Sequence, residues 1–127
     1  MVYHYSTSTN TWDYWSTQTG GALQSMTDGG GYWIHTKSAD VLTVYGLEAT
    51  TIGYNLQASW NILGFTSIEE QDYDSYLGSI GDSCSLMYGW DAAAGSWFSV
   101  DTNQGGGNLE PGHGYWVYMN APGTVLI

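Results

Sequence analysis

The sequence predicts an all-β, mostly β fold with one short helix. Hydrophobic residues make up 43% of the 127 residues, charged residues only 10%, and glycine occurs 18 times. This composition is too apolar for a disordered chain and too rich in glycine for a helical bundle. Short runs of alternating apolar and polar residues lie between turn-forming residues, which favours strands. The length fits one domain, so we expect a single domain over residues 1–127, folded as a compact sandwich or barrel.

The expected strands follow one another along most of the chain. Two hairpins are predicted, with strands at 3–6 and 12–16 and at 86–91 and 96–101. Asn10 and Gly95 in their loops suit a positive φ. Further strands are expected at 31–36, 41–45, 51–56, 60–66, 114–120 and 124–127. A partial apolar face predicts the helix within 67–80, with Glu69 and Glu70 in its first turn, where the helix dipole favours acids.

Part of the chain is repeated. Tyr3 and Trp12 return as Tyr88 and Trp97 at an offset of 85 residues. Residues 26–35 align with 109–118, and residues 41–44 with 124–127, both at an offset of 83. Three anchors in the same order, with two residues lost after the first, predict two pseudo-repeats. We call residues 2–44 the first copy, residues 87–127 the second copy, and residues 45–86, which occur once, the single-copy segment.

The chain thus begins in the middle of a repeat unit. Two interpretations are open: the sequence is part of a longer array, or the domain closes by joining its two ends. The first residues have neither the basic nor the apolar region of a signal peptide, so we expect a mature fragment.

The charge balance disfavours several classes of partner. Twelve acidic residues stand against a single basic one, Lys37, which gives a net charge of -11. Phosphate groups would find almost no basic side chains, so we expect nucleic acid and anionic membrane surfaces to be poor partners. No apolar stretch approaches the roughly 20 residues that a membrane-spanning helix needs, so we expect no membrane insertion. Scarce Lys and Arg with abundant Ser, Thr, Asn, Gly, Trp and Tyr are typical of secreted or cell-surface microbial proteins, which predicts an extracellular or cell-surface location.

Two stretches resemble a known repeat. Residues 60–65 read Trp-Asn-Ile-Leu-Gly-Phe, and residues 110–119 read Glu-Pro-Gly-His-Gly-Tyr-Trp-Val-Tyr-Met. They resemble a repeat of archaeal and bacterial cell-surface and secreted proteins, in which a W-N-L-[IV]-G strand precedes a Y-x-Y-D hairpin with a Trp and then a P-G-x-G-Y-W-V strand. The resemblance covers nearly the whole chain and implies a noncatalytic extracellular module. The first copy departs from it at Asp28, where the second has Pro111, and has no W-N-L strand.

No motif for catalysis is present. The sequence has no G-x-S-x-G elbow, Walker loop or dinucleotide fingerprint, and no local pattern marks one carboxylate as a general acid or nucleophile. Cys84 has no partner for a disulfide or a zinc site, so we interpret it as a buried small hydrophobic residue. The acidic run 69–74 with Asp82 lacks the pattern of an EF-hand and is interpreted as a solvated helix start. We therefore expect no catalytic residues, no metal site and no cofactor.

The aromatic residues carry the functional prediction. Seven Trp and 11 Tyr exceed what the core of one small β domain readily takes up, so some rings are expected at the surface. Flat rings stack on the apolar faces of sugars, and neighbouring polar groups hydrogen-bond the hydroxyls. The sequence thus predicts a carbohydrate-binding module with a polysaccharide or glycan as partner. Its expected ligand-binding residues, on the two hairpins, are Trp12, Asp13, Tyr14, Trp15, Trp90, Asp91, Trp97, Phe98 and Asp101.

Two alternatives stay open. The same aromatic residues can form cross-strand pairs that hold a thin sheet together. The protein would then be a structural or adhesion repeat of a microbial surface-layer or secreted protein, with no small ligand. Self-association through the terminal strands is a further hypothesis, because the edge beside residues 124–127 is expected to lack a partner strand.

Overall fold

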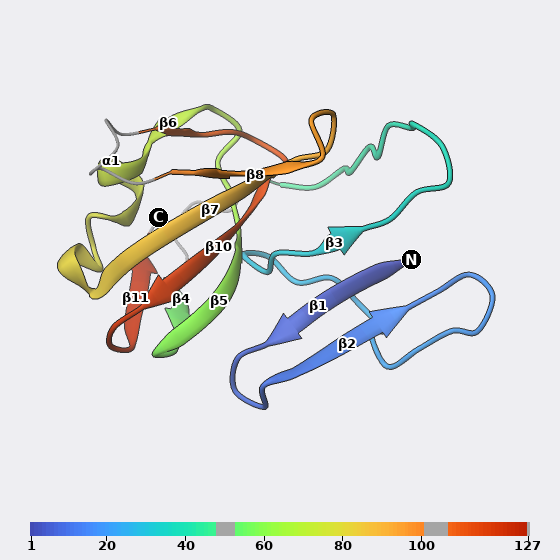
Figure 1. Ribbon diagram of the computed structural model, residues 1–127, viewed down its shortest axis with the longest axis horizontal. Helices are drawn as coiled ribbons and strands as arrows, with labels where there is room; N and C mark the ends of the chain where they lie inside the picture. The colour runs from blue at the N-terminus through green and yellow to red at the C-terminus, as the bar shows by residue number, and fades with distance from the viewer. Residues whose placement is uncertain (48–52, 101–106, 127) are drawn as a thin grey trace.

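A computed structural model of the protein describes residues 1–47, 53–100 and 107–126. The chain is mostly β, with one short α-helix (Figure 1), which confirms the predicted all-β class. The strands form a three-stranded sheet, a four-stranded sheet and two two-stranded sheets. A sandwich or barrel is not confirmed.

The elements agree with the predicted hairpins and with most of the predicted strands. In chain order they are β1 (Val2–Ser6), β2 (Thr11–Trp15), β3 (Trp33–Ile34), β4 (Gly53–Leu56), β5 (Ser59–Gly64), β6 (Gln71–Asp72), α1 (Tyr73–Leu77), the 3-10 helix η1 (Gly81–Ser83), β7 (Cys84–Asp91), β8 (Ser96–Ser99), β9 (Asn108–Leu109), β10 (Gly114–Met119) and β11 (Gly123–Leu126). Asn10 and Gly95 have φ values of 53° and 64°, as their loops require.

Two local predictions are wrong. Residues 41–47 form no strand, because no counterpart of β4 lies beside them in the described part of the chain. The helix begins at Tyr73 rather than near Glu69 and Glu70, so these acids precede its first turn. It begins there because Asp72 pairs in β6 and caps the helix, with its carboxylate accepting a hydrogen bond from the Ser75 N–H at 3.2 Å.

The two largest sheets have the same pairing order. The first copy forms the order β2-β1-β3, and the second copy forms β8-β7-β10, which β5 extends. All of these pairs are antiparallel, and Figure 1 shows the two sheets as separate groups of strands. The terminal strand β11 pairs with β4 along one edge, and no described strand pairs with its other edge, so self-association through this edge stays a prediction.

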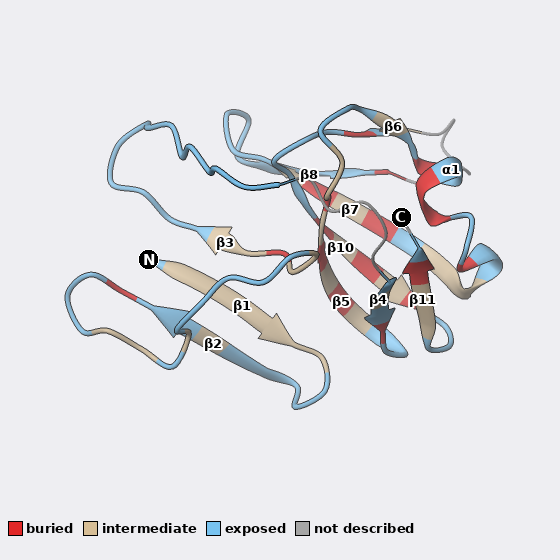
Figure 2. Cartoon of the chain, turned by 180° about the vertical axis from the view of Figure 1, so that it is seen from behind, coloured by how far each residue is buried: buried red, intermediate tan, exposed pale blue. Residues whose placement is uncertain are grey.

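The core lies on one face of the four-stranded sheet. Strand alternation directs Met87, Tyr115 and Val117 to this face, where each is at most 1% exposed. Residues of α1, β4 and β11 cover them, as the buried segments in Figure 2 indicate. Cys84 packs against this core from a half-buried position rather than the buried one that we predicted.

Asn61 of the Trp-Asn-Ile-Leu-Gly stretch closes the turn between β4 and β5. Its side-chain oxygen accepts a hydrogen bond from the Gln57 N–H at 3.0 Å. Its amide nitrogen donates to the carbonyl oxygens of Gln57 at 2.8 Å and Ser59 at 3.0 Å. Ser59 has a φ of 88°, which is costly for a residue other than glycine, so these hydrogen bonds hold a turn that the backbone disfavours.

The buried tyrosines predict a loss of stability at alkaline pH. Burial raises the pKa of Tyr76 and Tyr115 above that of an exposed tyrosine. The unfolded chain therefore releases these protons first, so the free energy of unfolding is unaffected below about pH 10 and falls as the pH rises further. Urea unfolding between pH 8 and about pH 11 should show this fall. It should be smaller in Tyr76→Phe and unchanged in Tyr45→Phe, since Tyr45 is exposed. Equal pH dependence in all three proteins would contradict the explanation.

Candidate functional site

Each of the two largest sheets has one aromatic face. On the four-stranded sheet this face points away from the core, because the strands alternate. It carries Trp60, Tyr88, Trp90, Trp97, Trp116 and Tyr118. The matching face of the first copy carries Tyr3, Tyr5, Trp12, Tyr14 and Trp33.

Trp116 of β10 joins the two aromatic faces. Its ring contacts Tyr5 and Trp12 of the first copy, with centroid distances of 5.6 and 5.8 Å. Trp60 of β5 meets the same ring edge-on at 6.1 Å. A hydrogen bond from the Thr7 hydroxyl to the Trp60 carbonyl oxygen, 2.9 Å long, further ties the first hairpin to β5.

Trp33 makes the matching contacts from the other side. Its ring meets Trp90 at 5.6 Å and Trp97 at 5.4 Å, both edge-on. In the alignment of the two copies, Trp33 corresponds to Trp116. Its partners Trp90 and Trp97 correspond to Tyr5 and Trp12, which are the first-copy partners of Trp116. The copies therefore meet through a self-complementary surface, as the subunits of a two-fold symmetric dimer do.

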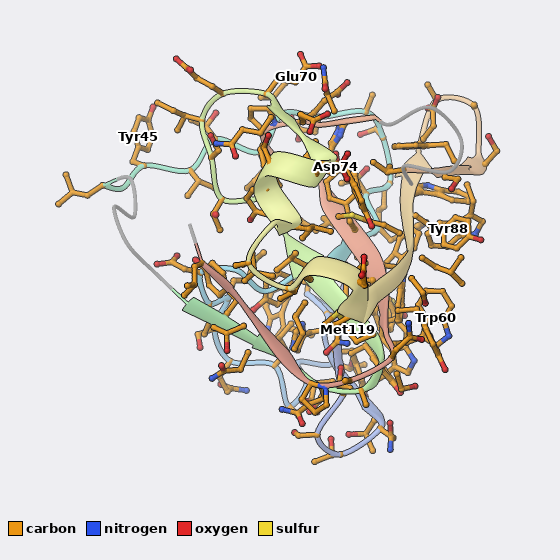
Figure 3. The ribbon with its side chains drawn as sticks, turned by 90° about the vertical axis from the view of Figure 1, so that its left-hand side faces the viewer. Tyr45, Trp60, Glu70, Asp74, Tyr88 and Met119 are labelled. Carbon is orange, nitrogen blue, oxygen red and sulfur yellow. The ribbon has the colours of Figure 1, made fainter. Side chains whose placement is uncertain are left out.

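An open cleft of about 630 Å³ lies between these faces. It is lined by Trp12, Trp33, Trp60, Tyr88, Trp97 and Trp116. Trp12 and Trp97, which occupy matching positions in the two copies, are 47% and 50% exposed. Figure 3 shows Trp60 and Tyr88 side by side at one edge of the molecule, and their ring centroids are 6.2 Å apart. The cleft thus combines an aromatic floor with two half-exposed indole rings.

Four of the predicted binding residues lie on the aromatic faces. Trp12 and Trp97 line the cleft. Trp90 packs edge-on against Trp97 at 5.1 Å. Tyr14 lies on the first-copy face beside Tyr3, at 6.2 Å, but does not line the cleft.

Three others point to the opposite faces. Asp13 and Trp15 alternate with Trp12 along β2, so they lie on the far side of the first sheet. Phe98 lies on the core side of β8, over Gly89, where an added Cβ would come within 2.2 Å of its ring. The alternation of the strands therefore separates these side chains from the cleft.

The two remaining predicted residues contribute no described contact to the cleft. The Asp91 carboxylate accepts hydrogen bonds from the backbone N–H groups of Ala93 and Ala94, at 2.8 and 2.9 Å. It therefore shapes the turn between β7 and β8. Asp101 lies outside the described residues.

The hairpin-based prediction missed Trp33, Trp60, Tyr88 and Trp116 of the cleft. Trp33 and Trp116 could have been found from the sequence. Successive side chains of a strand point to opposite faces, so each ring lies on the face opposite to that of its apolar neighbour, Ile34 or Val117. Trp60 could not be found in this way, since it depends on the pairing of β5 with β10, which are distant in sequence.

Hydrogen bonding at the cleft is left to the indole N–H groups and the Tyr88 hydroxyl. Within the described ranges, no hydrogen bond joins an indole N–H of the cleft to another protein group. These groups can donate to oxygen atoms of a ligand.

Other chemistry is sparse in the described residues. No group of three or more His, Cys, Asp or Glu side chains is placed there to hold a metal ion. Burial raises the pKa of the Cys84 thiol, so it is protonated and weakly nucleophilic at neutral pH. No helix in the described ranges is long and apolar enough to cross a membrane.

No protein-family model matches the chain, and no match was found among curated proteins or solved structures. The site is therefore interpreted from its own geometry.

Proposed function

We propose that the protein is a noncatalytic glycan-binding module of an extracellular or cell-surface microbial protein. One observation carries this proposal: an open cleft of about 630 Å³ whose lining side chains are all aromatic. This volume falls within the roughly 300–1,000 Å³ of typical ligand sites.

The chemistry of the cleft suits sugar rings. A pyranose has apolar C–H faces that pack on flat aromatic rings, and Trp12 and Trp97 offer such rings from opposite copies. The indole N–H groups can donate to hydroxyl oxygens, which gives the ligand an orientation. Because no basic side chain lines the cleft, a neutral glycan is favoured over an anionic one.

The extracellular setting is supported by sequence. A single basic residue in 127, together with the resemblance to surface and secreted repeats, favours a location outside the cell.

A second candidate function also has a specific observation in its favour. The reciprocal ring contacts of Trp33 and Trp116 hold the two copies together in the absence of any ligand. In a structural or adhesion repeat, the aromatic faces would serve only to join the repeats, and these ring contacts would be sufficient for that role.

Affinity electrophoresis against plant, microbial and host polysaccharides separates the two candidates. We expect retardation by at least one neutral glycan, accompanied by a change in Trp fluorescence. Trp97→Ala should weaken binding about tenfold, because one stacking contact contributes about 1 kcal/mol or slightly more.

Trp15→Ala is the matched control. Trp15 is 40% exposed, close to the exposure of Trp97, but it lies on the opposite face of its sheet. Its replacement should leave binding unchanged. No retardation by any glycan would reject glycan binding and favour the structural repeat, and equal losses in the two variants would move the site away from the cleft.

A further inference from the structure

The face of the first copy opposite the cleft is apolar, and none of the described strands or helices covers it. Val2, Trp15 and Ile34 share it by strand alternation, Met26 lines a hollow with Val2 and Trp15, and Leu42 lines a second hollow with Met26. In the alignment of the two copies, the counterparts of these five residues are Met87, Val100, Leu109, Val117 and Val125. All five counterparts are at most 2% exposed. Val2 is only half-buried, and the other four first-copy residues are 40% to 67% exposed. The first copy therefore has apolar residues at the positions that form the core in the second copy, but in the first copy they are not buried.

The second copy shows what covers such a face. There, residues 53–83 supply β4, β5 and α1, and their buried Leu56, Leu63 and Tyr76 belong to the core. We call residues 53–83 the cover segment. No counterpart of it packs on the first copy in the described part of the chain.

The first sheet also has an open edge, which is the edge of β3 that faces away from β1. Met1 and His35 exchange two backbone hydrogen bonds, of 2.9 and 2.8 Å. Antiparallel pairs alternate, so the N–H and C=O of Ile34 point away from β1. The counterpart of Ile34 is Val117 on β10. The edge of β10 that corresponds to the open edge of β3 is paired with β5. A strand added beside β3 would thus extend the sheet to the order that the second copy already has.

The uncovered face is hollowed. A depression of about 260 Å³ is lined there by Val2, Trp15, Leu23 and Met26, among others. Gln24 and Ser25 also line it, and an exposed apolar surface rimmed by polar residues is typical of an interaction site.

We propose that this face of the first copy is a docking site for a strand and helix with the sequence pattern of the cover segment, supplied by a further repeat of the same kind on a partner polypeptide. Binding would add a strand to the open edge of β3 and bury the apolar face beneath a short amphipathic helix. The proposal is independent of glycan binding, since it concerns the opposite face of the sheet.

A second copy of this chain is a poor donor. Residues 1–127 hold one cover segment, and that segment already packs on the second copy. If two chains exchanged cover segments, as many faces would stay uncovered as before. The partner must therefore bring an additional segment.

The test uses the full chain and a synthetic peptide of residues 53–83 carrying a fluorescent label. We expect saturable binding in a fluorescence anisotropy titration, with one peptide per chain. Leu42→Asp should weaken it at least tenfold, because Leu42 corresponds to the fully buried Val125. Thr43→Asp is the matched control, since its counterpart Leu126 is 66% exposed, and it should bind as the unchanged chain does. Hydrogen exchange at the Ile34 amide should slow on binding.

Three results would overturn the proposal. The first is the absence of binding. The second is binding that Leu42→Asp does not affect and that leaves exchange at Ile34 unchanged, because the peptide would then be displacing the chain's own β4 and β5. The third is a dimer in sedimentation without peptide that Leu42→Asp converts to a monomer, which would make a second copy the occupant.

Discussion

Replacement of Gly29 by alanine is expected to lower the free energy of unfolding by about 3 kcal/mol or more. Gly29 has a φ of +72°, and an added Cβ would come within 1.8 Å of the Tyr54 ring on β4. Its carbonyl oxygen accepts a hydrogen bond from the Gly64 N–H at 2.9 Å. The new methyl group would push this loop off β5 and weaken the attachment of the first copy.

Gly112→Ala is the control for this experiment. Gly112 is the counterpart of Gly29, with a φ of +80°, but nothing lies within 4 Å of an added Cβ. Its free energy of unfolding should fall by only about 1 kcal/mol, which is the cost of placing a residue with a Cβ in the left-handed conformation. Urea unfolding of the three proteins measures the difference. Equal losses would mean that the close approach of Gly29 to Tyr54 does not stabilise the fold.

Removal of the Trp116 side chain is expected to lower the free energy of unfolding by up to about 3 kcal/mol, the lower end for a buried tryptophan, because the ring is half-buried. Its ring contacts Tyr5, Trp12 and Trp60, so its loss weakens the packing between the two sheets. Trp33→Ala should have the same kind of effect, because Trp33 makes the matching contacts.

Double-mutant cycles test the reciprocity itself. The coupling energy of the Trp116 and Trp12 pair should be about 1 kcal/mol and should match that of the Trp33 and Trp97 pair. Trp15 with Trp116 is the control pair, on opposite faces of different sheets, and should show no coupling. A large coupling for one pair and none for the other would contradict a self-complementary interface.

The hairpins could be predicted from the sequence because they depend on neighbouring residues. Alternation and turn residues such as Asn10 and Gly95 act within a few positions, so β1 with β2 and β7 with β8 were predicted to within about two residues. The pairs β5 with β10 and β6 with β9 join distant segments, and no local signal sets their register.

The strand predicted at residues 41–45 illustrates the same limit. Its sequence has the apolar, β-branched character of a strand, but strands form only where a partner accepts their backbone hydrogen bonds. The matching residues of the second copy are paired with β4, whereas β4 has no counterpart beside the first copy in the described residues.

The candidate site was predicted in part for a similar reason. The aromatic excess indicated exposed rings, and Trp12 and Trp97 are indeed half-exposed in the cleft. Choosing whole hairpins, however, included Trp15 and Phe98, which alternation directs to the other faces. Assigning the side chains of each strand to its two faces would have removed Trp15 and Phe98 from the predicted binding residues.

Fluorine NMR of the protein labelled with fluorotryptophan, titrated with the neutral glycan that retards it most, tests most directly whether the aromatic cleft binds sugars. Its seven tryptophans give separate probes, which single Trp→Phe variants assign. We predict that the resonances of Trp12 and Trp97 shift together with saturation, while that of Trp15 stays unchanged. A glycan that shifts Trp15 and leaves Trp12 and Trp97 unchanged, or a panel in which no glycan shifts either cleft residue, would contradict the account.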